Sequence, residues 1–195
     1  MARYGKEHKD ITRRRIIDAA SKRFKQDGFD GSGVATLMSD AGLTNGAFYA
    51  HFESKDDLVA TVVHEELSRQ AASFSDLKLG RDGLQDFVRE YLSTKHRDHP
   101  DVGCPSAALL DEIGRSSAAA KQAYTVGAKA ILKEIASRLS PHDPDAAQGT
   151  ALNLFTMMIG TMQLARALSD RRLSKTVLEN GAQSALAMIA ADQRT

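Results

Sequence analysis

Residues 28–58 read GFDGSGVATLMSDAGLTNGAFYAHFESKDDL, and this stretch decides the fold. Apolar residues recur at helical spacing on both sides of Gly42, which favours two short helices joined by a tight turn. Glycine permits the sharp backbone turn at Gly42. Val34, Leu37, Leu43 and Phe48 are placed to pack the two helices against each other. The pattern predicts a helix-turn-helix.

The flanking sequence predicts a helix on each side of this motif. The first runs from about Thr12 to Asp27, with an apolar stripe and Gly28 as its C-terminal cap. We expect Ser32 to cap the second helix and Thr44 the third. Ser54 and Asp57 resemble a capping box, with Asp in place of the usual Glu or Gln, at the start of a fourth helix. The stripe residues are Ile16, Ile17, Ala20 and Phe24 in the first helix, and Leu58, Val59, Val62, Val63 and Leu67 in the fourth.

The rest of the chain also predicts helices, so the fold class is all-α with about nine helices. A break at 73–83 separates the fourth helix from a fifth helix at 84–92. Pro and Gly residues indicate a loop at 96–105. Further helices are expected over 105–114, over a segment from Tyr124 that stops at Ser140-Pro141, over 145–169 and over 174–191. We place an N-terminal domain at 1–57 and a C-terminal domain at 58–195.

The charge of the chain is unevenly distributed. Residues 1–25 hold nine Lys/Arg and three acidic residues, a net charge of +6, whereas the remaining residues carry −5. A basic end on an acidic body is typical of a protein that presents one end to a polyanion. The third helix has a small polar outer face of Asn45, Gly46, Ala47 and Ala50. Small residues let a helix enter the major groove of DNA, where Asn can pair with adenine.

Residues 12–60 resemble the signature of the TetR/AcrR family of transcriptional regulators. The shared features are a glycine after the first helix, an Ala-Gly turn, Tyr-x-His-Phe, and Ser-Lys before the fourth helix. The resemblance implies a repressor that binds double-stranded operator DNA and has a C-terminal domain for effector binding and dimerisation. It also implies phosphate contacts by Ser32 and Thr36, base contacts by Thr44, Asn45, Gly46 and Ala47, sugar-phosphate contacts by Tyr49 and His51, and a phosphate clamp by Lys55. Asn45 departs from the basic residue often found at its position.

The two last helices predict a homodimer. The segment 145–169 is apolar on nearly every side, and a helix of that kind must be covered on every side. One subunit covers one face of it, so we expect a partner subunit to cover the other. The interface would consist of the last two helices.

Flexible methionines and aromatic side chains in the C-terminal helices suggest an apolar cavity for a hydrophobic or aromatic effector. Any one of these residues could instead be ordinary core. Cys104, at or just before a helix start, could alternatively sense electrophiles or oxidants, because helix N-termini lower thiol pKa values. A buried inert cysteine is the commoner case. The candidate pocket residues are Phe87, Tyr91, Cys104, Leu109, Tyr124, Phe155, Met158 and Met162.

Two other functional classes compete with an effector-controlled regulator. An enzyme with Cys104 as nucleophile and His96, His99 or His142 as base lacks a phosphate loop, nucleophile elbow or HExxH box. His96 and His99 beside Cys104 lack zinc-type spacing and are interpreted as solvated loop histidines. A C-terminal domain that docks a protein instead of an effector stays open. We expect no catalysis, cofactor or metal, and a cytoplasmic protein without a membrane helix or internal disulfide.

Overall fold

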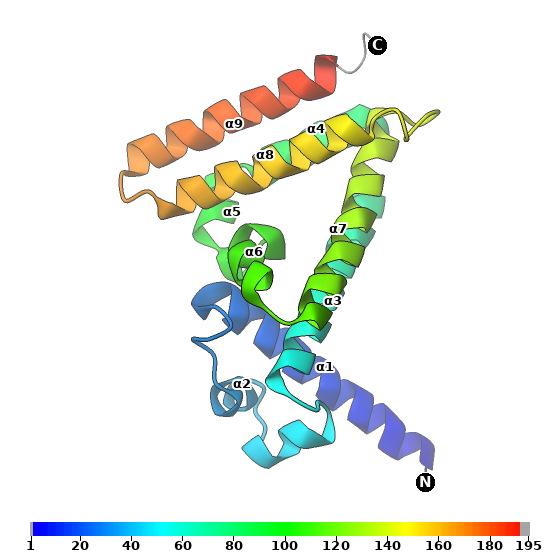
Figure 1. Ribbon diagram of the computed structural model, residues 1–195, viewed down its shortest axis with the longest axis vertical. Coiled ribbons are helices and arrows are strands. Elements are labelled where there is room, and N and C mark those ends of the chain that lie inside the picture. Colours follow the sequence, from blue (N-terminus) through cyan, green and yellow to red (C-terminus); the bar gives the residue numbers. More distant parts are fainter. Residues whose placement is uncertain (1, 192–195) are drawn as a thin grey trace.

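The computed structural model describes residues 2–191, with side chains from residue 7 onward. Figure 1 shows α1, α2 and the first short helix at one end of the molecule, and α4, α8 and α9 at the other. This confirms the all-α class, since residues 2–191 contain helices and no strand. In order, the helices are α1 (Ala2–Asp27), α2 (Val34–Asp40), η1 (Asn45–Ala50), α3 (Lys55–Ser73), η2 (Phe74–Asp76), α4 (Gly80–Tyr91), α5 (Thr94–Asp98), η3 (Pro100–Val102), α6 (Pro105–Arg115), α7 (Ala118–Leu139), α8 (Gln148–Ala167) and α9 (Arg171–Ala191), where η marks 3-10 helices.

Helix α1 contains the predicted apolar stripe but begins earlier than predicted. All four stripe residues are buried in the core, as expected. The helix starts at Ala2 instead of Thr12, because the polar residues before Thr12 include no proline to interrupt it. Gly28 ends α1 in a left-handed conformation (φ 78°), and Gly42 turns the chain between α2 and η1 in the same way (φ 67°).

The caps of α2 and η1 differ from prediction. Gly33 is the N-cap of α2, and no side chain caps that end. Ser32 instead donates its hydroxyl to the Gly28 carbonyl at 2.9 Å, which fixes the turn after α1. Thr44 does occupy the N-cap position of η1, but its hydroxyl forms no capping bond, and the helix is a 3-10 helix.

The start of α3 agrees with prediction. The Ser54 hydroxyl accepts a hydrogen bond from the Asp57 amide at 3.1 Å. Asp57 in turn accepts from the Glu53 amide at 3.1 Å. The shorter Asp side chain thus forms the reciprocal bond one residue before the N-cap, a variant of the capping box.

The segment between α3 and α6 is more helical than predicted. The break at 73–83 holds η2, and α4 begins at Gly80. The predicted loop at 96–105 contains the end of α5 and all of η3. Ser93 caps α5 by accepting from the His96 amide at 3.1 Å, and Pro100 starts η3. Proline at a first helical position favours such a turn, although proline inside a helix interrupts it.

The two ends of the molecule are joined by α3, which packs along α7 (Figure 1). The helices approach closely at Gly127, where a Cβ atom would lie 2.3 Å from the Leu67 Cβ. Helices α8 and α9 pack side by side, and α4 packs on α7 and α9. One hydrophobic cluster runs from α1 to α9, and the domain boundary at 57/58 stays a prediction. No helix among residues 2–191 has the length and hydropathy of a membrane span.

Candidate nucleic-acid interface and junction pocket

The 3-10 helix η1, called the reading helix below, is held from beneath by two phenylalanines. Phe48 and Phe52 are buried, and their ring centroids lie 5.7 Å apart. Thr44, Asn45 and Gly46 are exposed, whereas Ala47 is half-buried against the core. A rigid apolar base thus presents small and polar groups to solvent, as a helix that enters a groove requires.

Tyr49 is the most prominent side chain of the reading helix. It is 71% exposed, and its ring meets Phe48 edge-on at 5.2 Å. An exposed aromatic ring fixed at its base keeps its hydroxyl in a defined position at little entropic cost. Its phenol is therefore available to a phosphate or sugar.

His51 ends the reading helix within a basic environment. Its Nδ1 atom is buried and has no hydrogen-bond partner. Burial lowers the pKa of His51, and the charges of Lys9 and Arg13 lower it further. Arg13 lies over the Phe52 ring at 4.8 Å and donates to the Thr61 hydroxyl at 3.4 Å. Helix α1 therefore adds positive charge beside the reading helix.

Of the remaining predicted DNA contacts, Thr36 and Lys55 are accessible and Ser32 is buried. Thr36 is exposed on α2, and Lys55 is partly exposed at the first position of α3. Both lie at the end of the molecule that holds the reading helix (Figure 1). The Ser32 side chain is fully buried and already bonded to Gly28, so the prediction that this hydroxyl contacts phosphate does not fit the structure.

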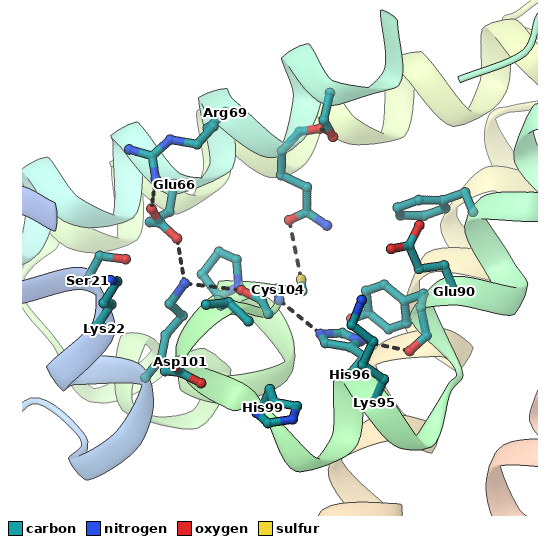
Figure 2. A pocket seen from close by; sticks show the side chains of 18 of the residues that line it. Ser21, Lys22, Glu66, Arg69, Glu90, Lys95, His96, His99, Asp101 and Cys104 are labelled. Atoms are coloured by element: carbon teal, nitrogen blue, oxygen red, sulfur yellow. Dashed lines mark hydrogen bonds and ion pairs between the residues drawn. The ribbon is translucent and has the colours of Figure 1, made fainter. Parts of the chain in front are cut away.

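A pocket of about 840 Å³ lies where α1 meets α3, α4, η3 and the start of α6, and we call it the junction pocket (Figure 2). Three predicted pocket residues line it: Phe87, Tyr91 and Cys104. The other five do not. Four of these fill the core: Leu109, Phe155, Met158 and Met162. The fifth, Tyr124, is half-buried and donates its hydroxyl to Ser106 at 3.2 Å. Their apolar stripes face neighbouring helices instead of a cavity.

A buried ion pair forms one wall of this pocket. Lys25 of α1 and Glu66 of α3 are joined at 2.7 Å, with side chains only 4% and 8% exposed. Lys25 Nζ also donates to the Gly103 carbonyl at 3.3 Å. Arg69 links Glu66 at 2.7 Å to Asp18 at 3.2 Å. This network was not predicted from the sequence, although the charged Glu66 within the apolar stripe of α3 indicated it.

His96 connects α5 to the start of α6. Its Nδ1 lies 2.7 Å from the Tyr91 carbonyl, and its Nε2 accepts from the Cys104 amide at 3.0 Å. This pattern assigns the neutral ring with the proton on Nδ1, and burial lowers the pKa of His96 accordingly. With both nitrogens occupied and the ring half-buried, His96 is neither a solvated loop histidine nor a free metal ligand.

Cys104 is the N-cap of α6 and is buried, 7% exposed. Its thiol donates to the Gln70 side-chain carbonyl at 3.3 Å. Figure 2 shows Cys104 between the ion pair of Glu66 and the ring of His96. The cysteine therefore lies at the centre of the contacts between α3, α5 and α6.

The helix-turn-helix of this chain matches a known family. A model described as bacterial regulatory proteins, tetR family, covers residues 16–62, which span the end of α1 to the first half of α3. This helix-turn-helix region, residues 16–62, belongs to the tetR family. A transcriptional repressor of Mycobacterium tuberculosis is 32% identical over 93 residues, which are 48% of this chain and 47% of that protein. The matched stretch is thus less than half the length of this relative.

Two solved structures share this fold over most of the chain. Reduced NemR of Escherichia coli superposes with a TM-score of 0.75 at 19% identity, covering 89% of this chain and 94% of NemR. FadR of Bacillus subtilis, solved with stearoyl-CoA, gives a TM-score of 0.61 at 17% identity, covering 90% of this chain and 96% of FadR. At these identities the likeness shows a shared fold that includes the C-terminal helices, and it does not show shared ligands.

Proposed function

We propose that this TetR-family protein binds operator DNA as a repressor and is released by a small molecule. The observation that carries the proposal is the reading helix, whose polar residues are exposed above the buried pair Phe48 and Phe52. Lys55 and the basic face of α1 lie beside it and would bind phosphates. The junction pocket supports an effector site, as does the stearoyl-CoA complex of the similarly folded FadR.

The repressor would act as a homodimer through α8 and α9. Leu152 and Leu164 of α8 remain 53% and 52% exposed, and Leu173 of α9 is 48% exposed. A second copy would cover these side chains and place two reading helices in successive major grooves, about 34–36 Å apart. Light scattering should give twice the monomer mass, and Leu152→Glu with Leu164→Glu should shift the mass toward the monomer.

DNA selection from a random pool tests the main proposal. The enriched duplex should bind with an affinity that falls steeply as salt rises, because phosphate contacts release counterions. Lys55→Ala should weaken binding and lower the salt slope by about 1 per half-site. Lys121→Ala, an exposed lysine of α7, serves as the matched control. Failure to enrich any duplex at low salt would overturn the proposal.

A second candidate is a regulator whose sensor is the Cys104 thiol. It is favoured by the position of Cys104 at the N-terminus of α6, on the wall of the junction pocket. Release from DNA by N-ethylmaleimide, lost in Cys104→Ser, would support it. Release that persists in Cys104→Ser would dismiss it. A cytoplasmic location and the absence of catalysis remain predictions of the same proposal.

A further inference from the structure

A buried hydroxyl in the junction pocket lacks a well-formed hydrogen bond. Tyr91 lines the pocket and is only 4% exposed, yet its Oη has no hydrogen-bond partner of good geometry, and the Cys104 thiol lies beside it. Burial raises the pKa of this phenol well above its ordinary value, and the Cys104 thiol raises it further. The hydroxyl therefore stays protonated and can donate. An unpaired buried donor is costly unless something else accepts from it.

A half-buried positive charge lies near this hydroxyl. Arg166 of α8 donates to the carbonyls of His96 at 2.8 Å and Arg97 at 3.2 Å, and its Nη1 is buried without a partner. No carboxylate pairs with it in the described part of the chain. Burial lowers the pKa of Arg166, whereas the charge of Arg166 favours the ionised form of Tyr91. Such a positive field favours an oxygen with negative charge or a strong dipole.

The wall beside Tyr91 is aromatic. The ring centroids of Phe87 and Tyr91 lie 5.8 Å apart, and Phe74 packs behind Phe87 at 4.7 Å. Leu77 and Pro105 extend the apolar surface. The volume of the pocket falls within the range of about 300–1,000 Å³ found for small-molecule sites. A flat apolar body fits this wall.

We propose that the junction pocket binds a small aromatic molecule that carries a carboxylate or carbonyl oxygen, which accepts from Tyr91 Oη, and that the Lys25 contacts transmit its binding to the DNA-binding helices. The first part concerns the ligand alone. The second part rests on the proposed function.

The route of transmission follows from two contacts between α1 and the α6 region. Lys25 near the end of α1 holds the Gly103 carbonyl just before α6 and the Glu66 carboxylate of α3. Near the other end of α6, Glu112 accepts from the Phe29 amide, directly after α1. A ligand that accepts from Tyr91 Oη presses on the neighbouring Cys104, displaces the Gly103–Cys104 segment and weakens the hold of Lys25 on it. The angle of α1 to α3 then changes.

Binding is tested with three probes of one shape: 2-naphthoate, 2-acetylnaphthalene and 2-methylnaphthalene, the last without an acceptor oxygen. Calorimetry on the full chain should give Kd values for the first two that are about fivefold to tenfold lower than for the third, the effect of one added hydrogen bond. In Tyr91→Phe, which keeps the ring, this advantage should vanish. Equal binding of all three probes, no binding, or an unchanged advantage in Tyr91→Phe would overturn the ligand assignment.

Transmission is tested by operator affinity with and without saturating 2-naphthoate. The probe should weaken operator binding of the parent protein several-fold. In Lys25→Met with Glu66→Leu, which removes both buried charges together, 2-naphthoate should still bind while operator affinity no longer responds. Glu112→Gln, a milder change at the second contact, should reduce the response if the double variant does not fold.

Two failures are distinguishable. A protein that binds 2-naphthoate but no DNA contradicts the proposed function and leaves the ligand assignment standing. A protein that binds DNA, and whose double variant and Glu112→Gln both keep the full response to 2-naphthoate, contradicts the transmission route alone.

Discussion

The reading helix and the junction pocket are built in opposite ways. The reading helix exposes polar groups above two buried rings, and its side chains from Asn45 to Ala47 form no long-range hydrogen bond that fixes them. The pocket wall buries charges and joins α1, α3, α5 and α6 through Lys25, Glu66, His96 and Cys104. The exposed residues of the reading helix contribute little to the stability of the fold, whereas the residues of the pocket wall contribute both to stability and to the proposed regulation. Mutations should therefore separate the two regions cleanly.

The largest effect is expected from Lys25→Met. This change leaves the Glu66 carboxylate buried with only the half-exposed Arg69 as its partner. Breaking a buried pair costs about 3–5 kcal/mol, and the remaining Arg69 places the expected loss near 3 kcal/mol. Urea unfolding measures it, with exposed Lys22→Met as the control. A loss below about 1 kcal/mol would show that the pair is not isolated from water.

The cap of α3 should contribute less. Ser54→Ala removes the acceptor of the Asp57 amide and should lower the free energy of unfolding by about 1 kcal/mol. Ser75→Ala, whose hydroxyl bonds only to the preceding turn and to Asp76, is the control in the same urea titration. Equal changes in the two variants would contradict a capping role for Ser54.

A smaller and pH-dependent effect is expected at His96. Burial lowers its pKa below the ordinary 6.5, so the unfolded chain takes up a proton that the folded chain resists. The free energy of unfolding should therefore fall as the pH decreases from about 6.5, and stay unaffected by His96 above it. Burial also lowers the pKa of His51, so this residue contributes to the pH dependence of the unfolding free energy in the same direction. His96→Gln should consequently flatten the pH dependence between pH 7.5 and 5.5 only in part, and an identical slope would refute the assignment.

The smallest effect on stability is expected at Tyr49, where the effect on DNA binding should be large. Because its side chain is 71% exposed, Tyr49→Ala should change the free energy of unfolding by less than about 0.5 kcal/mol. Operator affinity should fall about tenfold or more. Leu79→Ala, at an exposed site far along the chain, is the control. A destabilised Tyr49→Ala would weaken the contrast between the two regions.

Local signals in the sequence predicted the helix-turn-helix and the cap of α3 better than they predicted the junction pocket. Gly42, Phe48 and Ser54 act within a few residues of their partners, so their spacing predicted the turn, the packing and the cap. The predicted cap at Ser32 was wrong because its hydroxyl bonds to the Gly28 carbonyl instead, and the Thr44 hydroxyl forms no capping bond.

The pocket depends on contacts between residues far apart in the chain. Lys25 and Glu66 are 41 residues apart, and Lys25 and Gly103 are 78 apart. Helical periodicity places Phe155 and Met158 on an inward face, but it does not say whether that face meets a cavity or another helix. Only Phe87, Tyr91 and Cys104 of the predicted set border the pocket, because the cavity lies beside α1 and not inside the C-terminal helices.

Helix α3 is uninterrupted from its Ser54 cap to Ser73, and this continuity has a mechanical consequence. Its 19 residues make a rod about 28 Å long, whose first turn follows the reading helix and whose last turns border the pocket. A rod of that length acts as a lever. A tilt of only about 10° at the pocket would carry the opposite tip through about 5 Å, close to half the width of a major groove at about 12 Å. Small adjustments around a bound molecule can thereby become larger displacements at the reading helix.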